Sequence, residues 1–545
     1  MSNACFFVPE PHNEPVLDYA PGSAERSSLR ARIAAMHAEV ADIPLVIGGR
    51  ELRTGRTVEV HVPHQHGHRL ATCHLAGERE VGLAIEAVLE ARNAWSMMSW
   101  EDRGAVFLKA AELLAGPWRD TLNAATVLGQ SKTFQQAEID SACELIDFWR
   151  FNVSFMADQM AEQPLSSPGT WNRLEYRALE GFVFAVTPFN FTAIGGNLPT
   201  APAMMGNTVL WKPATTSVYA NYLTLKLLEA AGLPPGVINF VPGDGAAVAA
   251  QALAHRELSG VHFTGSTDVF NSLWARVGAG IGTYRQYPRL VGETGGKDFI
   301  FVHPSSRELL PELVVAALRG AFEFQGQKCS AASRMYLPRS LWPAFREAWL
   351  DTVAQVRVGD PAEPANFMGA VIDRKAFDRI RAAIDFARAS NAAEILSGGG
   401  CDDSTGYFIE PTTILTTDPR FRTMEEEIFG PVLTMYVYDD AALEDTLALC
   451  DQTSPYALTG AVWAQDRAAL AMMTRRLRNA AGNFYLNDKP TGAVVGQQPF
   501  GGARGSGTND KAGSPLNLLR WTSARTIKET FVPPRDWRYP SMGAD

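Results

Sequence analysis

From Gly181 onward, short apolar runs alternate with helix-like stretches, and this alternation constrains the fold more than any other feature of the chain. The apolar runs cover residues 182–186, 208–212, 237–241 and 260–263, with helical periodicity at 219–231 and 246–254. Strands that alternate with helices form a parallel sheet that the helices cover. We therefore expect an α/β fold built on a parallel sheet.

A second alternation of the same kind follows. Strands are expected at 298–303, 334–337 and 432–438, and helices at 311–324, 341–356, 375–390 and 442–450. Because 545 residues exceed one ordinary core, two or three domains are expected. The segment 517–532 is expected to be a strand or an arm that reaches a partner subunit.

The first 180 residues are organised differently. A helix is expected at 27–39, antiparallel strands between residues 43 and 75, mostly helix from 79 to about 159, and an extended segment at 171–179. Most acidic residues of a long helix at 134–155 are expected on its solvent face. The hairpin region carries histidines at positions 61, 64, 66, 68 and 74. A metal site is one interpretation, but no cysteine or carboxylate cluster accompanies them, so a solvated hairpin is favoured.

Composition restricts the class of protein. With 46% hydrophobic and 20% charged residues the chain resembles an ordinary globular protein. A net charge of −10 argues against nucleic acid or an anionic membrane as the main partner. Six cysteines without CxxC spacing suit a reducing compartment. The N-terminus lacks a signal-peptide core and an Arg-rich transit pattern, and no apolar run is long enough to span a bilayer. We expect a cytoplasmic enzyme that acts on a small molecule.

Cys329 lies in a setting that suits a nucleophile. It follows an expected helix that Gly326 ends, and Lys328 adds positive charge that favours a thiolate. Small residues follow the sulfur and leave backbone N–H groups free for an oxyanion. On this segment alone, a buried structural cysteine is an equally good interpretation.

Three further segments stand at the ends of expected strands, where open α/β sheets build their sites. Asn190 offers a neutral donor for an oxyanion, or is a turn asparagine. Lys212 can reach a nucleotide hydroxyl or phosphate, or is a surface lysine. Gly265 and Ser266 open a helix whose N-terminus suits a pyrophosphate, although they form no GxGxxG fingerprint.

Two glutamates complete the candidates. Glu293, flanked by glycines at a strand end, is placed to act as a general base, with a solvated loop glutamate as the alternative. Glu427 can accept hydrogen bonds from a ribose, and Phe429 can press against a flat ring. The alternative for the acidic run at Glu427 is a charged helix start.

Together and in this order, these segments resemble the aldehyde dehydrogenase superfamily over about residues 40 to 530. The resemblance implies metal-free oxidation of an aldehyde by NAD(P)+, with Cys329 as nucleophile, Glu293 as general base and Asn190 as oxyanion donor. It also implies a set of residues that line the dinucleotide: Thr187, Pro188, Phe189, Lys212, Gly265, Ser266, Glu427 and Phe429.

The superfamily fold combines a Rossmann-type NAD-binding domain, an α/β catalytic domain and an oligomerisation arm. By resemblance, residues 1–160 and 181–294 form the N-terminal and NAD-binding domain, and 295–490 form the catalytic thiol domain. The arm comprises 161–180 and 508–535 and implies a homodimer or higher homo-oligomer.

A narrower resemblance is to the branch that oxidises L-glutamate 5-semialdehyde to L-glutamate with NAD, the second step of proline degradation. It is carried by residues 14–23, 136–140, 322–331 and 491–504. The substrate has an α-carboxylate and an ammonium group. Neutral donors from Ser330, Gly492 and Ala493 can bind the carboxylate. Of the remaining residues, Glu138 is expected to bind the ammonium and Phe500 to pack against the methylene chain. Lys328 is expected to add a positive electrostatic field.

Two departures from the family pattern qualify these expectations. Many NAD-preferring members have a glutamate soon after the Lys-Pro pair, where Thr215 and Thr216 stand here, so NADP is not excluded. Ala493 stands where some relatives have serine. The alternatives are an aldehyde dehydrogenase for another semialdehyde and a thioesterase-like or non-catalytic protein of the same fold.

Overall fold

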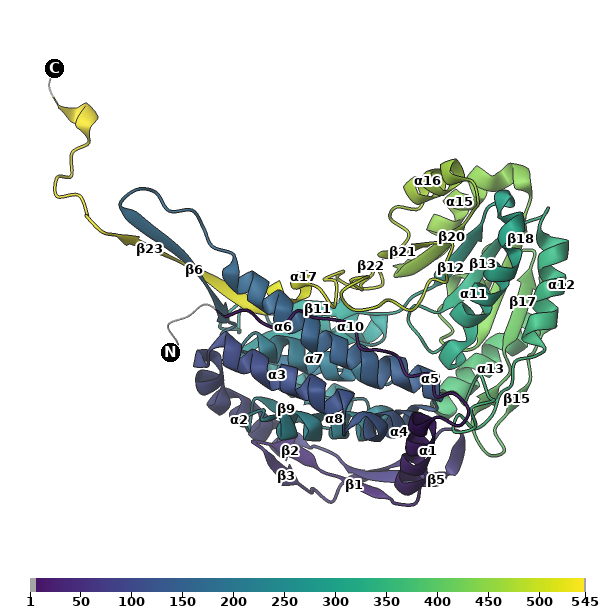
Figure 1. Ribbon diagram of the computed structural model, residues 1–545, viewed down its shortest axis with the longest axis horizontal. Coiled ribbons are helices and arrows are strands. Elements are labelled where there is room, and N and C mark those ends of the chain that lie inside the picture. The colour runs from purple at the N-terminus through teal and green to yellow at the C-terminus, as the bar shows by residue number, and fades with distance from the viewer. Residues whose placement is uncertain (1–5, 544–545) are drawn as a thin grey trace.

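Two seven-stranded sheets organise the structure, a computed structural model that describes residues 6–543 (Figure 1). Cys5 lies outside the described residues. The first sheet has the order β11-β10-β7-β8-β9-β2-β3, and its first five strands in that order run parallel. Its strands are β2 Leu45–Ile47, β3 Arg50–Leu52, β7 Phe182–Val186, β8 Thr208–Lys212, β9 Ile238–Phe240, β10 Leu258–Thr264 and β11 Arg289–Glu293.

Helices cover both faces of this sheet, as the alternation of strands and helices predicts. Val183 and Ala185 of β7 pack into one core, whereas Phe182 and Phe184 pack into another on the opposite face. The first face is covered by α3 Trp100–Ala115, α4 Arg119–Gln130, α6 Leu145–Ala161, α7 Thr192–Met204 and α8 Val218–Ala231. The second is covered by α2 Glu78–Met97, α9 Gly245–Ala254 and α10 Thr267–Ala279.

The second sheet has the order β14-β17-β18-β13-β12-β20-β21 and is parallel except for the β14–β17 pair. Its strands are β12 Asp298–Val302, β13 Ala332–Pro338, β14 Ala393–Ser397, β17 Thr412–Thr416, β18 Val432–Tyr438, β20 Thr459–Trp463 and β21 Asn483–Leu486. One face packs on α11 Leu310–Phe322 and α12 Trp342–Val353. The other packs on α13 Arg374–Arg388, α15 Leu443–Gln452 and α16 Arg467–Arg476.

Smaller elements complete the molecule. Helix α1 Ala24–His37 precedes a three-stranded sheet of β1 Ala41–Ile43, β5 Gln65–His74 and β4 Thr57–Val62. The β4–β5 hairpin is antiparallel as predicted, but β1 joins β5 in parallel. Two short antiparallel pairs are β15 Cys401–Asp402 with β16 Phe408–Ile409, and β19 Tyr456–Ala457 with β22 Ala503–Arg504. The short helix α14 spans Arg422–Glu425.

The histidines of the β4–β5 region go to separate partners. His64 contacts Ser131, and His66 contacts the backbone carbonyl of Asp403. Within residues 6–543, no three or more Cys, His, Asp or Glu side chains gather as a metal site would require. Over the same residues, no helix combines the length and apolarity that crossing a membrane demands.

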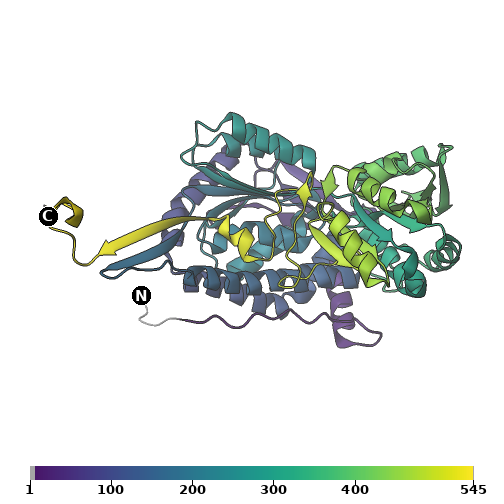
Figure 2. The same ribbon diagram turned by 90° about the horizontal axis from the view of Figure 1, so that it is seen from above.

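A two-stranded antiparallel ribbon projects from the body of the molecule (Figures 1 and 2). Its strands are β6 Thr170–Ala178 and β23 Thr522–Thr530, which pair along their whole length. The short helix α17 Pro515–Leu519 precedes β23. The ribbon contains most of the extended segment predicted at 171–179 and residues 522–530 of the segment predicted at 517–532, whose first three residues are helical and belong to α17. The division of the chain into domains stays a prediction.

The long helix expected at 134–155 is not one regular α-helix. It consists of α5 Phe134–Ala137, a π-helix Glu138–Glu144 and α6. The expectation that its acidic residues face solvent is wrong, because Glu138 and Asp140 are fully buried. Each has a buried cation as partner: Arg119 for Glu138 and Lys132 for Asp140.

Candidate active site

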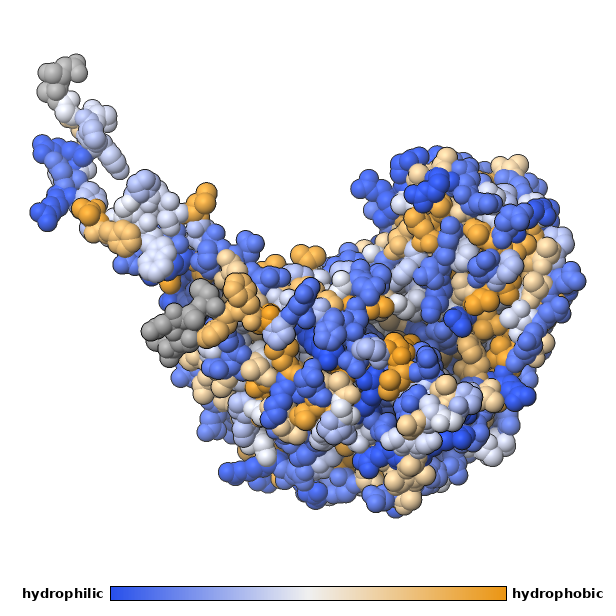
Figure 3. Space-filling model, in the orientation of Figure 1, coloured by the Kyte–Doolittle hydropathy of each residue, from blue (hydrophilic) through white to orange (hydrophobic). Residues whose placement is uncertain are grey.

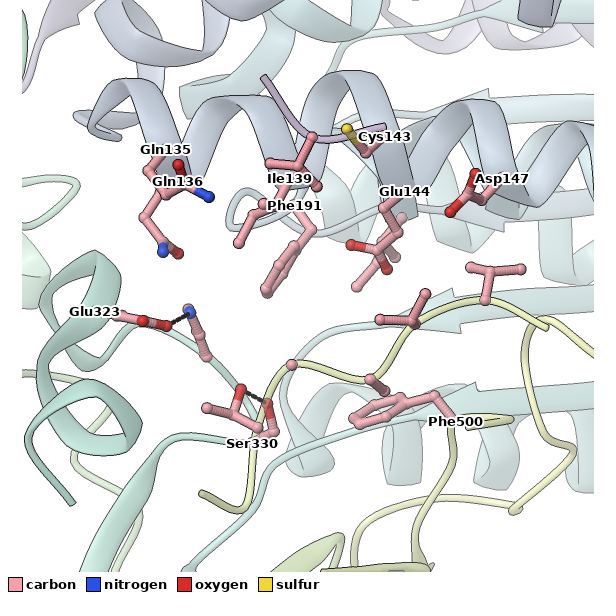
Figure 4. A pocket seen from close by; sticks show the side chains of 18 of the residues that line it. Gln135, Gln136, Ile139, Cys143, Glu144, Asp147, Phe191, Glu323, Ser330 and Phe500 are labelled. Carbon is pink, nitrogen blue, oxygen red and sulfur yellow. Dashed lines mark hydrogen bonds and ion pairs between the residues drawn. The ribbon is translucent and has the colours of Figure 1, made fainter. Parts of the chain in front are cut away.

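A cavity of about 1310 Å³ lies between the α5–π-helix–α6 segment and the loop 491–500 (Figure 4). The catalytic candidates Cys329 and Glu293 both line it. So do the predicted substrate residues Lys328, Ser330, Gly492, Ala493 and Phe500. The fold thus brings together segments that lie more than 350 residues apart in the chain, from Phe134 to Phe500.

A strained turn delivers Cys329 to this cavity. Helix α11 ends at Phe322, before Gly326, because Phe324 and Gln325 already have left-handed backbones with φ of 52° and 56°. Such a conformation costs a non-glycine residue roughly 1 kcal/mol or more. The Gln325 amide compensates by donating to the carbonyls of Ser131 and Ala370. At Gly326, a Cβ would lie 2.3 Å from the Gly430 carbonyl oxygen, so only glycine fits.

The surroundings of the thiol do not favour a resting thiolate. Burial raises the pKa of Cys329 well above its usual value, and the nearby carboxyl groups of Glu293, Asp298 and Glu427 raise it further. Lys328 was expected to counter this effect. Its ammonium is instead 3.0 Å from Glu323, which neutralises the charge, so that expectation is corrected. Lys328 still forms part of the cavity wall.

Glu293 ends β11 and is held there by the loop that follows residue 505. Gly292 exchanges two hydrogen bonds with Thr508, each 2.9 Å long. Burial raises the pKa of Glu293 to about 8, with Lys511 opposing the shift. A carboxyl group with this pKa can take up and release a proton near neutral pH.

Asn190 contacts the turn that carries the thiol. Its buried amide nitrogen Nδ2 donates a hydrogen bond of 3.1 Å to the carbonyl of Gln327, two residues before Cys329. A primary amide has two N–H donors, so one remains for an oxyanion. The structure thus places the predicted oxyanion donor against the turn that carries the predicted nucleophile.

The cavity wall also carries neutral polar groups. The hydroxyls of Ser330 and Thr491 are 2.7 Å apart. Gly492, with φ of 95°, turns the backbone of the loop that Ala493 continues along the cavity. Phe500 and Phe191 point into the space between this loop and the π-helix (Figure 4). Phe191 was missed from the sequence, although it directly follows Asn190.

The structure corrects the assignment of Glu138 to the substrate ammonium. Glu138 does not line the cavity; it is ion-paired with Arg119 and accepts hydrogen bonds from Tyr19 and Asn123. Glu144, the last residue of the π-helix, lines the cavity instead. Burial and Asp140 raise the pKa of Glu144 well above its usual value. No signal in the sequence distinguishes the two glutamates, because the choice depends on the π-helical geometry.

The predicted dinucleotide residues gather at one edge of the first sheet. The adjacent parallel strands β10, β7 and β8 end there. Gly265 and Ser266 follow β10, Lys212 is the last residue of β8, and β7 is followed by Thr187, Pro188 and Phe189. The ring of Phe429 meets that of Phe189, with 5.9 Å between centroids. Glu427 accepts a 2.9 Å hydrogen bond from the N–H of Gly296, three residues after Glu293.

Comparisons with known proteins agree with this arrangement. The model of the aldehyde dehydrogenase family matches residues 51–527. The delta-1-pyrroline-5-carboxylate dehydrogenase of Dictyostelium discoideum, which is named mitochondrial, is 52% identical over 98% of this chain and 96% of its own length. The delta-1-pyrroline-5-carboxylate dehydrogenase of Agaricus bisporus is also 52% identical, over 99% of this chain and 98% of its own length. The crystal structure of the Mycobacterium tuberculosis delta-pyrroline-5-carboxylate dehydrogenase with NAD is 55% identical, covers 100% of both chains and has a TM-score of 0.96.

Proposed function

The chain belongs to the aldehyde dehydrogenase family, and from this premise we propose that it oxidises L-glutamate 5-semialdehyde to L-glutamate with NAD+. The semialdehyde is the hydrolysed form of 1-pyrroline-5-carboxylate. The observation that carries the proposal is one cavity in which a thiol and a carboxyl base face a site for a doubly charged head group.

The head group finds a partner for each of its charges. Ser330, Thr491 and the backbone of Gly492 and Ala493 offer neutral donors to the α-carboxylate. On the facing π-helix, the carboxyl group of Glu144 offers its oxygens to the ammonium, whose positive charge favours ionisation of that carboxyl group. An aldehyde without these groups leaves the polar groups of the site unpaired, so a site of this kind discriminates against plain aliphatic aldehydes.

The strand ends fit a dinucleotide. The half-buried ammonium of Lys212 hydrogen-bonds to no other described residue, and burial lowers its pKa, so a hydroxyl or phosphate partner suits it. Lys212, Gly265 and Ser266 would hold the nucleotide from the first sheet, and Glu427 and Phe429 from the second. When bound, NAD+ accepts the hydride that leaves the aldehyde carbon.

Acylation depends on Cys329 and Asn190. Loss of the thiol proton frees the sulfur to attack the aldehyde carbon, which gives a thiohemiacetal. Its oxyanion is stabilised by the free N–H of Asn190 and by the backbone N–H of Cys329. These donors are neutral, so they favour the charge that forms during reaction without attracting a permanent anion.

Deacylation depends on Glu293. After oxidation the acyl group is held as a thioester on Cys329, and Glu293 takes a proton from the water that attacks it. L-glutamate and a free thiol result.

The test is oxidation of 1-pyrroline-5-carboxylate by the purified chain, followed by the absorbance of NADH. Turnover of this substrate with a much higher kcat/KM than propanal is expected. Turnover of another semialdehyde in its place would overturn the assignment of substrate. Because Thr215 and Thr216 place no carboxylate after Lys212, the same assay is run with NADP+.

We also propose that the protein is a homodimer in the cytoplasm. The projecting ribbon supports the first point, because an isolated two-stranded ribbon is only marginally stable in water. The cysteines at positions 73, 143, 329, 401 and 450 are all free, which supports a reducing compartment. Light scattering after size exclusion measures the mass, and cell fractionation locates the protein.

A further inference from the structure

The N-terminal segment 13–21 forms part of the wall of the catalytic cavity. It runs as extended chain along the helical layer before α1 begins (Figure 2). The residues of this segment that line the cavity are Asn13, Glu14, Val16, Asp18, Tyr19, Ala20 and Pro21. We call residues 13–19 the N-terminal strap.

Buried ion pairs fasten the strap to the helices. Glu14 bridges Arg119 and Arg150, with a distance of 2.7 Å to each guanidinium. Glu138 accepts hydrogen bonds from the N–H of Leu17 at 3.0 Å and from the hydroxyl of Tyr19 at 2.7 Å. The carboxylate expected to bind substrate therefore fixes the strap. Desolvated charge-assisted bonds of this kind give a defined geometry and resist displacement.

Asn13 extends the strap to the loop that faces the thiol. Its Nδ2 donates to Asp147 of α6 and to the carbonyl of Val495, both at 2.8 Å. Its Oδ1 accepts a 2.9 Å hydrogen bond from Gln497. The neighbouring N–H of Glu14 donates to the second oxygen of Asp147 at 2.7 Å. One side chain thus joins α6 to the loop 491–498.

That loop packs Val495 into the core but has few other hydrogen bonds. Its internal bonds connect Val494 with Gln497 and Gln498. Within the described part of the chain, the only hydrogen bonds that reach residues 491–498 from outside the loop come from Asn13 and from Ser330, which contacts Thr491. Gly492 and Gly496 both have positive φ, so the backbone has little intrinsic preference to hold this shape.

We propose that Asn13 is a positioning residue that holds the loop 491–498 in the conformation that binds the head group of the substrate. The inference rests on the proposed function, because Gly492 and Ala493 of that loop are its carboxylate site. Asn13 touches no reacting atom. It acts on selectivity, since only an aldehyde with a charged head group uses the loop.

The test compares Asn13→Ala with His12→Ala, a change at the neighbouring, exposed position. Asn13→Ala is expected to raise KM for 1-pyrroline-5-carboxylate about tenfold, which corresponds to the loss of one or two hydrogen bonds. Its kcat/KM for propanal is expected to stay within about twofold of wild type. His12→Ala should change neither value. An equal loss on both substrates, or no loss, would overturn the proposal.

Hydrogen exchange of the loop gives a readout that does not depend on the substrate. In Asn13→Ala the amides of residues 491–498 should exchange faster, while those of β7 and β8 stay as in wild type. Unchanged exchange in the loop would refute the positioning role. If wild type fails to oxidise 1-pyrroline-5-carboxylate, the proposed function is what fails, and the exchange experiment still decides whether Asn13 positions the loop.

Discussion

At the scale of single residues, the chemistry depends on where the proton of Cys329 goes. Burial and the carboxyl groups around it keep this thiol protonated, and only a thiolate is an effective nucleophile. The pKa of Glu293 is raised to about 8, so this carboxyl group can exchange a proton with the site near neutral pH. Burial thus raises the pKa values of both Cys329 and Glu293, the two groups that lose or take up protons during acylation and deacylation.

The first prediction concerns Glu293 and pH. Only the ionised carboxylate can take a proton from water, and a raised pKa means that this form is populated as pH increases. The rate of deacylation should therefore rise toward pH of about 8 and level off above it. Rapid-mixing measurement of turnover after the first burst of NADH reports this rate.

The matched variant for this prediction is Glu293→Gln. It should lower steady-state turnover by about 10²-fold or more and remove the pH dependence, while the burst of NADH remains. A variant that loses the burst along with turnover would show that Glu293 is required earlier in the reaction, at deprotonation of the thiol.

The second prediction concerns Cys329→Ala. Without the thiol no covalent intermediate forms, so NADH production should fall by about 10³-fold or more. The small side chain keeps the turn, so thermal unfolding and binding of NAD+, followed by tryptophan fluorescence, should match wild type. Residual oxidation close to the wild-type rate would exclude Cys329 as nucleophile.

At the scale of elements, the π-helix connects Lys132 with the segments that carry Asn190 and Cys329. Asp140 lies 2.7 Å from Lys132 and also accepts hydrogen bonds of 2.9 Å from the N–H groups that begin α7. The Lys132 ammonium lies over the rings of Phe191 and Phe324, at 4.1 and 4.4 Å from their centroids. One buried ion pair thus holds the segment after Asn190 and the strained turn before Cys329.

The third prediction follows from this pair. Lys132→Met leaves Asp140 as a buried, unpaired charge, which should lower the free energy of unfolding by about 3–5 kcal/mol. Urea denaturation measures this loss. The control is Lys226→Met, because the Lys226 pair with Glu229 is partly exposed and its removal should cost about 1 kcal/mol or less. Equal losses in the two variants would contradict a special role for the buried pair.

The same elements show what the sequence could and could not predict. The bounds of β7, β8 and β18 were predicted correctly, since strands buried on both faces appear as continuous apolar runs. The π-helix was missed, because periodicity arguments assume a regular α-helix and because the partners Lys132 and Arg119 come from other segments. The wrong choice of Glu138 over Glu144 has the same origin.

At the scale of the whole molecule, segments from the first and last parts of the chain lie against each other. Asn13 bonds to Val495, and strand β6 pairs with β23 across more than 340 residues. Contacts of this span leave no local pattern in the sequence. The motifs predicted residues of the cavity wall such as Cys329 and Glu293, whereas only the structure shows the strap and its attachment to the loop.

The last prediction concerns assembly. The ribbon and the segment beyond it expose the large side chains of Trp171, Phe531 and Val532. Figure 3 shows some hydrophobic residues on a projection that is otherwise mostly hydrophilic. Exposed apolar side chains on a projecting element are typical of a surface that a partner covers. If a second copy of the chain covers this surface, Phe531→Asp with Val532→Asp should convert the proposed dimer to a monomer. The free energy needed to bury the new charges exceeds the free energy that the contact gains.

Light scattering after size exclusion measures that change in mass. The matched control is Met97→Asp with Tyr287→Asp, since both of these apolar side chains are 79% exposed but lie on the body of the molecule. The control should keep the mass of wild type. A ribbon variant that also keeps it would place the subunit interface elsewhere, and the ribbon would then need another partner to bury its apolar side chains.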